Sequence, residues 1–455
     1  MSELLKITES GITVSTLETF ATALSYKRLQ KHLAMKISRA IALYSLKILL
    51  EETEGIISAL DAIGSFGLAG MQWVKNLRKV CHVDINVGCG LKQSVGAVLE
   101  ENSCCFEKVE VLCEDPNVLM HSKKFQYIYI ESTSTAVTYF DAAMRSINHN
   151  GILCVTCSDI ATLQNKCPET AKRLYNANLL RTEYSNELAI RVIVLNLARA
   201  AGRWGKGIKV EMSTFANDAI TLVCRVLRGS KYACDSLEAL CLLAHCQQCQ
   251  AREFVSEKKY ALHTFSSIPF CRCGDDKVGS PIALLGPMWS KGIFDQDFMK
   301  KMLSVDMNCD LPKETKKLFE LIFVETICCS HDEMEQLMVN RSLPPKTTLT
   351  NTEKIEPPSK KQKMTAGCCD NEKDVQEQLH PTSCAKEIPP FYFDIQQHTA
   401  KGSNPPKLAL VISKLRECGF YASKTHFGPR CVRTSASLKE FSSLLVNMWK
   451  ESTEK

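Results

Sequence analysis

The segment Leu60–Gly70 joins an apolar run to glycines at positions 64, 67 and 70. Glycines in a turn between a strand and a helix let the backbone approach a ligand closely. The next apolar run contains Val83-Asp84-Ile85, and an acid at the end of that strand could accept hydrogen bonds from both hydroxyls of a ribose. This pattern predicts a site for a nucleoside-containing cofactor, unless Gly64 and Gly67 only shape a tight strand-to-helix connection.

A second acid, Asp115, lies in Cys-Glu-Asp-Pro-Asn-Val after the third apolar run. Its carboxylate could accept a hydrogen bond from an adenine amino group, or it could form an Asx turn with Pro116. Because the glycine turn lacks a strict G-x-G-x-x-G pattern, a cofactor without a pyrophosphate fits better than a dinucleotide. Two acids after such a turn favour S-adenosylmethionine.

A third acid, Glu131, ends the apolar run Phe125–Ile130 and precedes Ser-Thr-Ser-Thr. Ligands of open α/β sheets bind at the carboxyl ends of the strands. A carboxylate there could accept the N–H of an exocyclic amine that receives a methyl group. The alternative is an exposed surface glutamate, because most glutamates are exposed.

The elements that would position these acids alternate along residues 56–228. The predicted strands are Ile56–Ile63, Cys81–Ile85, Val109–Cys113, Phe125–Ile130, Ile152–Cys157 and Ile220–Leu227. Strands that alternate with helical segments indicate a mostly parallel sheet covered by helices. Residues 1–55 are predicted to be mainly helical, and Leu188, Val192 and Leu195 recur at the spacing of a buried helix stripe.

Several longer motifs resemble the family of tRNA guanosine N2,N2-dimethyltransferases. Phe140-Asp-Ala-Ala143 resembles the family's "LDAA", and Glu187-Leu-Ala-Ile-Arg191 resembles its "EMALR". Further matches are Met-Lys-Ile-Ser-Arg at 35–39, Gly-Ile-Leu-Cys-Val-Thr-Cys-Ser-Asp at 151–159, Gly-Pro-Met-Trp at 286–289 and Ala-Ser-Lys-Thr-His-Phe at 422–427. The resemblance covers most of residues 35–337 and again 389–435.

The resemblance implies an α/β fold with a Rossmann-like class I methyltransferase domain over 35–228 and a smaller, Cys-rich α+β C-terminal domain. It implies methyl transfer from S-adenosylmethionine to the N2 amine of a tRNA guanosine near the junction of the D-stem and anticodon stem. The base would have to leave its stack to reach the cofactor. Glu131 would be catalytic, and the cofactor-binding residues would be Arg39, Asp61, Gly64, Gly67, Asp84 and Asp115.

One motif departs from the family. The family's Asp-Pro-Phe/Tyr-Gly-Ser-Pro is here Glu131-Ser-Thr-Ser-Thr-Ala136, so the carboxylate is one methylene longer and an aromatic stacking surface is missing. A second hypothesis is therefore a non-catalytic tRNA-binding paralogue, which the retained Asp84 and Asp115 argue against. A third is a protein-interaction module that recruits partners through residues 340–388.

Two of the chain's 23 cysteines form Cys246-Gln-Gln-Cys249 and two form Cys271-Arg-Cys273. Two such pairs can hold a tetrahedral Zn²⁺, and paired cysteines before the Gly-Pro-x-Trp motif are typical of the family. His245 and His263 are alternative ligands. Reduced buried thiols are the other interpretation, because scattered cysteines without a signal peptide indicate a reducing compartment.

Composition divides the rest of the chain. We expect an N-terminal helical segment over 1–34, a Cys-rich tRNA-binding domain over 229–337, a disordered basic linker over 338–388 and the completion of the second domain over 389–440. The linker's Lys360, Lys361 and Lys363 predict nuclear import, unless they are only solvated. A net charge of +6 and no long apolar stretch argue against DNA and membrane partners, so any phosphate contact must come from a local patch. Arg203, Lys206 and Lys209 near Trp204 could hold phosphate beside the cofactor cleft, or they could form a solvated loop.

Overall fold

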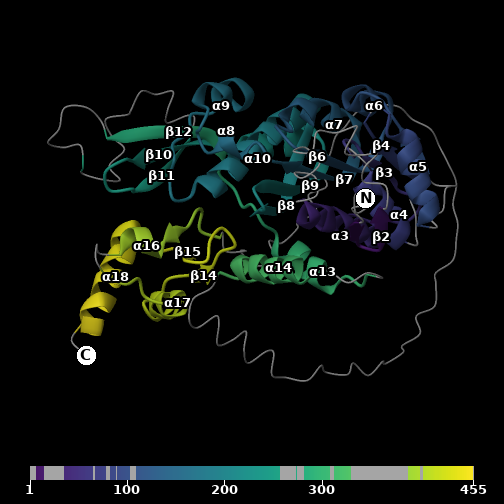
Figure 1. The fold of residues 1–455 in the computed structure, drawn as a ribbon. Helices are drawn as coiled ribbons and strands as arrows, with labels where there is room; N and C mark the ends of the chain where they lie inside the picture. The colour runs from purple at the N-terminus through teal and green to yellow at the C-terminus, as the bar shows by residue number, and fades with distance from the viewer. Residues whose placement is uncertain are drawn as a thin grey trace, which may run out of the picture.

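A computed structural model describes residues 7–14, 35–64, 67–77, 82–88, 90–102, 109–256, 273, 281–307, 312–328, 388–399 and 403–453 (Figure 1). Its largest element is a seven-stranded sheet of order β5-β4-β3-β6-β7-β9-β8. The strands are β3 Ser58–Asp61, β4 His82–Asn86, β5 Val109–Leu112, β6 Phe125–Ser132, β7 Ile147–Cys157, β8 Lys206–Ala216 and β9 Ala219–Arg228. The first five are parallel and β9 is antiparallel to both neighbours, so the predicted mostly parallel α/β sheet is confirmed.

Helices cover this sheet because its strands are apolar on both faces, as buried parallel strands are. They are α3 Lys36–Glu52, α4 Leu68–Asn76, α5 Lys92–Glu101, α6 Pro116–Ser122, α7 Phe140–Ser146, α8 Ile160–Leu163, α9 Pro168–Tyr175, α10 Ser185–Arg203 and α11 Ser230–Leu237. The predicted stripe of Leu188, Val192 and Leu195 on α10 is fully buried. No helix of the described residues is long and apolar enough to cross a membrane.

The basic residues Arg203, Lys206 and Lys209 do not form the predicted loop. Arg203 ends α10, and Lys206 and Lys209 lie in β8. Lys206 is buried, and its ammonium group donates to backbone carbonyl oxygens of the α7–β7 connection. The other two cations bind acidic side chains: Arg203 pairs with Asp141, and Lys209 pairs with Glu211 and Asp295. All three therefore make structural contacts within the fold.

The N-terminal segment also differs from its prediction. Residues 7–14 form a hairpin of β1 Ile7–Glu9 and β2 Ile12–Val14, so the expected helix over 1–34 is wrong there, and residues 15–34 lie outside the described part. The hairpin packs on the sheet domain through fully buried Ile12 and through Asn102, whose amide bonds both backbone groups of Thr13.

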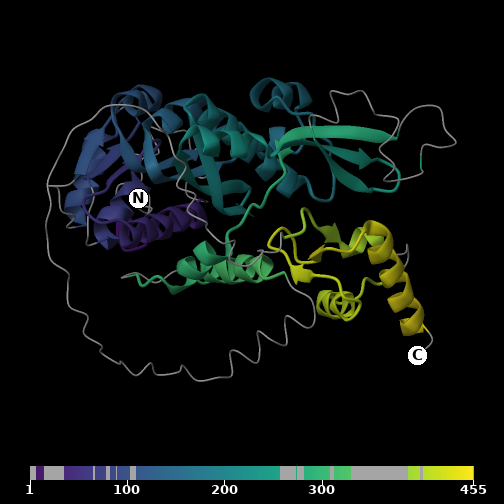
Figure 2. The ribbon, with the colours of Figure 1, turned by 180° about the vertical axis from the view of Figure 1, so that it is seen from behind.

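The second part of the chain contains two small antiparallel sheets, seen beside the large one in Figures 1 and 2. The first has the order β11-β10-β12, from Leu240–Cys246 (β10), Arg252–Ser256 (β11) and Ile282–Trp289 (β12). The second has the order β13-β15-β14, from Phe393–Asp394 (β13), Ala422–Lys424 (β14) and Cys431–Thr434 (β15). The helices are α13 Gln296–Ser304, α14 Lys313–Thr326, α16 Ile395–His398, α17 Leu408–Glu417 and α18 Leu438–Thr453. The predicted linker falls outside the described residues, except for residue 388 at its end.

A buried ionic network holds the C-terminal segment to the rest of the chain. Arg433 of β15 is 1% exposed and lies 2.8 Å from Glu187 of α10 and 2.7 Å from Glu325 of α14. Its guanidinium also donates to the carbonyl oxygens of Pro389 and Phe391. One side chain therefore connects four segments that are distant in the sequence.

Candidate active site

The glycine turn folds tightly over the carboxylate of Asp61, the last residue of β3. The Gly70 amide donates to Asp61 Oδ2 at 3.0 Å, and the Gly64 amide donates to the Asn86 carbonyl at 3.0 Å. A Cβ at position 64 would lie 2.7 Å from Asp61 Oδ2, and Gly67 has a φ of +73°. Both positions therefore require glycine for the turn itself, which agrees with the alternative that these glycines shape a tight strand-to-helix connection. The turn also brings backbone close to the carboxyl edge of the sheet.

Asp61 has an oxygen without a hydrogen-bond partner. The side chain is 0% exposed, and its Oδ1 has no donor within the described residues. Burial raises the pKa of this carboxyl to about 7, with the Gly70 amide and Arg39 opposing the shift and Glu131 adding to it. Because buried polar atoms are nearly always hydrogen-bonded, this oxygen suits a ligand donor such as an ammonium group.

Glu131 lies near the end of β6 and is 5% exposed, so it is not the surface glutamate of the alternative interpretation. Arg39 Nη1 is 3.3 Å from both of its carboxylate oxygens, and the Tyr129 hydroxyl donates to Oε2 at 2.9 Å. Burial lowers the pKa of the Arg39 guanidinium, but Glu131 and Glu9 raise it by more, so this group stays charged. The arrangement holds a carboxylate at the edge where the sequence predicted it.

Arg39 also binds Glu9 of the N-terminal hairpin, through Nε at 2.8 Å and Nη2 at 2.9 Å. Gln72 of α4 donates at 2.8 Å to Glu9 Oε1, the oxygen that also accepts from Arg39 Nε. Arg39 therefore bridges two carboxylates, which makes it a residue that positions Glu131. Sequence reasoning missed Glu9 and Gln72, because neither belongs to a motif and only the tertiary structure brings them together.

The turn after Glu131 is closed by hydroxyl groups. The Ser132 hydroxyl donates to the Thr135 carbonyl at 2.9 Å and accepts from the Ser134 amide at 3.2 Å. Tyr175 of α9 donates to Thr135 Oγ1 at 2.9 Å, and the same hydroxyl lies 2.9 Å from Asp159. These bonds stabilise the turn in place of the family's proline and glycine.

Asp84 does not lie at the carboxyl edge, so the prediction that it closes the second strand is wrong. It lies in the middle of β4, opposite Leu60, and its carboxylate accepts from Lys123 at 3.0 Å. It lines a cavity of about 470 Å³ with the first residues of β3, β4, β5 and β6, which is the opposite edge of the sheet. Asn86 ends β4 instead, and its amide group binds the Ala62 carbonyl and both backbone groups at Glu114.

Asp115 follows β5 and is exposed, as a ligand contact would require. Its Oδ1 accepts from the amides of Asn117 at 2.8 Å and Val118 at 3.2 Å, so it caps α6. This is the local role that the Asx-turn alternative predicted. The second carboxylate oxygen takes no part in these bonds.

Three of the four predicted metal ligands lie together. The sulfur atoms of Cys246, Cys249 and Cys273 are all within 4.8 Å of one another, and Cys271 lies outside the described residues. His245 lies beside Cys246 in the sequence, but its Nδ1 is 2.8 Å from the Tyr184 hydroxyl, where it serves a structural contact. Three thiols at this separation suit a tetrahedral metal site.

Comparisons with known proteins agree with this architecture. The sequence profile of the family "N2,N2-dimethylguanosine tRNA methyltransferase" matches residues 19–356 and 347–446. The tRNA (guanine(27)-N(2))-dimethyltransferases of Bos taurus and Homo sapiens are each 32% identical, over 444 and 445 residues, covering 90% of this chain and 59% of theirs. The chain thus spans about three fifths of the length of these relatives.

Two archaeal proteins match over nearly their whole length. The tRNA (guanine(26)-N(2))-dimethyltransferase of Methanobrevibacter smithii is 24% identical over 448 residues, which is 98% of both chains. The structure of Trm1 from Pyrococcus horikoshii with S-adenosyl-L-methionine has a TM-score of 0.66 and 19% identity, and covers 97% of this chain and 99% of that one. The profile match, the mammalian relatives and the shared fold lead to one conclusion: the chain belongs to the N2,N2-dimethylguanosine tRNA methyltransferase family.

Proposed function

We propose that the protein transfers methyl groups from S-adenosylmethionine to the N2 amine of a tRNA guanosine near the junction of the D-stem and anticodon stem. The observation that carries this proposal is the buried Glu131 carboxylate, held by Arg39 beside the glycine turn. The relatives named above support it, since their names place the reaction on guanine 26 or guanine 27 of tRNA.

The residues of the glycine turn fit the amino-acid end of the cofactor. The free Oδ1 of Asp61 can accept from its ammonium group, and glycine at positions 64 and 67 lets the turn pack tightly against Asp61 and Ile85 at this edge. The bound cofactor supplies an electrophilic methyl group on a sulfonium. The described end of β4 offers no carboxylate for the ribose hydroxyls, because Asp84 lies in the middle of the strand and lines the cavity at the other edge, and the Asn86 amide group binds backbone.

Glu131 would bind and orient the methyl acceptor. An ionised carboxylate accepts an N–H of the guanine amine, which directs the nitrogen lone pair towards the methyl group, and it can take up the proton directly or through water. Arg39 and Tyr129 fix its position. Ser132 and Ser134 shape the turn that accommodates the longer side chain.

Asp61→Asn should weaken cofactor binding and change its pH dependence. The pKa of the Asp61 carboxyl is raised to about 7, so the ionised form that binds an ammonium group is populated as pH rises through 7. We expect calorimetry to show affinity of the wild-type protein increasing between pH 6 and 8, and a flat, weaker profile for Asp61→Asn. An identical profile in the variant would remove Asp61 from the cofactor site.

The reaction itself is tested by incubating the full chain with labelled S-adenosylmethionine and tRNA transcripts, followed by mass spectrometry of the nucleosides. We expect N2-methylated guanosine, and loss of product when the guanosines at positions 26 and 27 are replaced by adenosine. Binding of tRNA without any methyl transfer would instead support a non-catalytic paralogue. The altered turn after Glu131 and the lack of an acid at the described end of β4 would then explain the loss of methyl transfer.

We propose that Cys246, Cys249 and Cys273 bind a structural Zn²⁺ with Cys271 as the fourth ligand. Freshly purified protein should contain about one zinc per chain, as a closed four-cysteine site does. Because metal binding is coupled to folding, chelation should increase amide exchange in β10 and β12 more than in the seven-stranded sheet. Metal analysis without zinc would refute this site, and Cys241→Ser, on the same strand, is the matched control.

Two further proposals concern the whole protein. We propose that residues 229–337 and 389–440 hold the tRNA. We also propose that the protein is found in the nucleus and nucleolus with some in the cytoplasm, and that Lys360, Lys361 and Lys363 direct its entry into the nucleus. Replacing these three lysines with alanine should move a tagged protein towards the cytoplasm. Replacing Lys313, Lys316 and Lys317 of α14 with alanine is the control and should leave the nuclear enrichment unchanged. Unchanged enrichment of the linker variant would reject this signal.

A further inference from the structure

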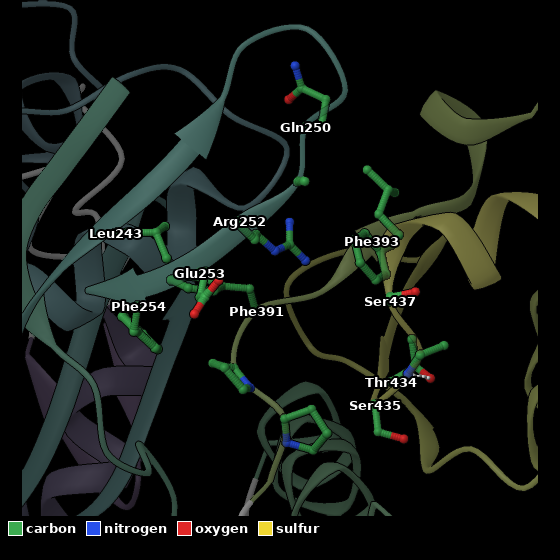
Figure 3. A pocket seen from close by; sticks show the side chains of 15 residues that line it. Leu243, Gln250, Arg252, Glu253, Phe254, Phe391, Phe393, Thr434, Ser435 and Ser437 are labelled. Carbon is green, nitrogen blue, oxygen red and sulfur yellow. Dashed lines mark hydrogen bonds between the residues drawn. The ribbon is translucent and has the colours of Figure 1, made fainter. Parts of the chain in front are cut away.

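We propose that a cavity between β11 and the C-terminal segment binds one unstacked nucleotide of the RNA substrate (Figure 3). The cavity has a volume of about 380 Å³, within the range of pockets that hold small ligands. Its walls include Arg252 and Phe254 of β11, Phe391, Phe393 and residues 434–438. The proposal rests on the RNA substrate proposed above and adds a contact site remote from the seven-stranded sheet, which supplies none of the lining residues.

Arg252 gives the cavity a fixed cation. Its guanidinium carbon lies 4.3 Å from the ring centroids of both Tyr184 and Phe393, so the two rings hold its plane. The side chain is 10% exposed and donates to Glu183 at 3.3 Å and to the Tyr392 carbonyl at 2.8 Å. These two bonds use two of the five N–H donors of a guanidinium, so donors remain for a ligand. A phosphate or a base carbonyl is a suitable acceptor.

The floor of the cavity is apolar and can contact a base. Leu243 of β10 and Phe254 of β11 lie on the β-sheet side of the cavity in Figure 3. The centroid of the Phe254 ring lies 5.7 Å from that of buried Phe391. Proteins that bind single-stranded RNA combine such stacking surfaces with cationic groups for the backbone.

The opposite wall offers hydroxyl groups. Ser435 and Ser437 are exposed in the segment that enters α18, and Figure 3 shows them across the cavity from Arg252. The Ser435 hydroxyl accepts from the Tyr421 amide, which leaves its own O–H to donate. An apolar floor, a cation with unused N–H donors and a hydroxyl wall favour a nucleotide over an apolar peptide, which would give those remaining donors and the Ser435 O–H no acceptor.

The test uses the full-length protein and a five-nucleotide single-stranded RNA with a central 4-thiouridine. We expect light-induced cross-links at β11 or at residues 391–393, located by mass spectrometry. Ser435→Glu adds a negative charge to the cavity wall at an exposed position and should weaken binding of this RNA by about ten-fold, comparable to the loss of one stacked base. Ser443→Glu makes the same change on exposed α18 surface outside the cavity and should bind like wild type.

Transfer RNA binding and methyl transfer are measured on the same proteins, so the two proposals can fail separately. Unchanged affinity of Ser435→Glu and cross-links elsewhere would overturn the nucleotide site, even if methyl transfer is normal. Preferential uptake of a short apolar peptide at the cavity would also overturn it. Cross-links at the cavity and a selective loss in Ser435→Glu would support the site, even if wild-type protein transfers no methyl group.

Discussion

Glu131→Gln should lower the rate of methyl transfer by about 100-fold or more, the range for removing a positioned acid or base. The amide keeps the size of the side chain but cannot carry the charge that receives the amine proton. Cofactor and tRNA affinity should change little, because the glycine turn and the proposed RNA-binding surfaces are untouched. The measurement is transfer of labelled methyl to tRNA under single-turnover conditions, with binding assayed in parallel.

Glu131→Asp and Asp141→Asn complete this test. Glu131→Asp restores the family's carboxylate and should retain part of the activity, which a purely structural role of the side chain would not predict. Asp141→Asn removes an exposed carboxylate on α7 and should leave the rate unchanged, since Asp141 pairs only with exposed Arg203 within the described structure. Equal turnover by wild type and Glu131→Gln would exclude Glu131 from the chemistry.

Arg433→Ala should release the C-terminal segment and destabilise it by about 3–5 kcal/mol, the cost of breaking a buried ion pair by removing one partner. Glu187 and Glu325 are both 0% exposed, so their charges would lose a buried partner. We expect faster amide exchange over residues 403–453 and earlier urea unfolding of that segment. Arg430→Ala, which removes an exposed arginine of the same segment, is the matched control.

The same network gives this segment a defined acid sensitivity. Burial raises the pKa of the Glu325 carboxyl, but Arg433, His426 and Thr425 lower it by more, to about 2. A lowered carboxyl pKa stabilises the folded state above the ordinary value near 4.5 and loses that contribution as pH falls towards 2. Wild-type protein should therefore lose segment stability between pH 4.5 and 2, and Arg433→Ala should show a smaller loss. A pH profile that Arg433→Ala leaves unchanged would refute this role of the network.

Local patterns predicted the sheet because its signals are contiguous. Each predicted strand is an apolar run bounded by polar or turn residues, and all six overlap strands of the structure. The missed strand, β8, contains Lys206 and Lys209 among glycines, which is typical of an exposed loop. Its pairing with β9, and the buried carbonyl groups that receive Lys206, depend on contacts that no local pattern reveals.

The site shows the same division. The sequence by itself predicted the glycine turn, the carboxylate near the end of β6 and the proximity of Cys246 to Cys249, because each lies within a few residues of the strand end that positions it. Only the tertiary structure decided that β4 extends to Asn86, so that Asp84 lies in the middle of the strand and lines the cavity at the opposite edge.

Tertiary structure also decided the ionic partners. Glu9 meets Arg39 across 30 residues, and Glu187 meets Arg433 across 246. Sequence spacing specifies which residues share a strand or a helix face, but the choice of a partner for a buried charge depends on which segments pack together. That choice follows from the whole core, because a buried charge is tolerated only where folding brings an opposite charge or hydrogen-bond donors to it.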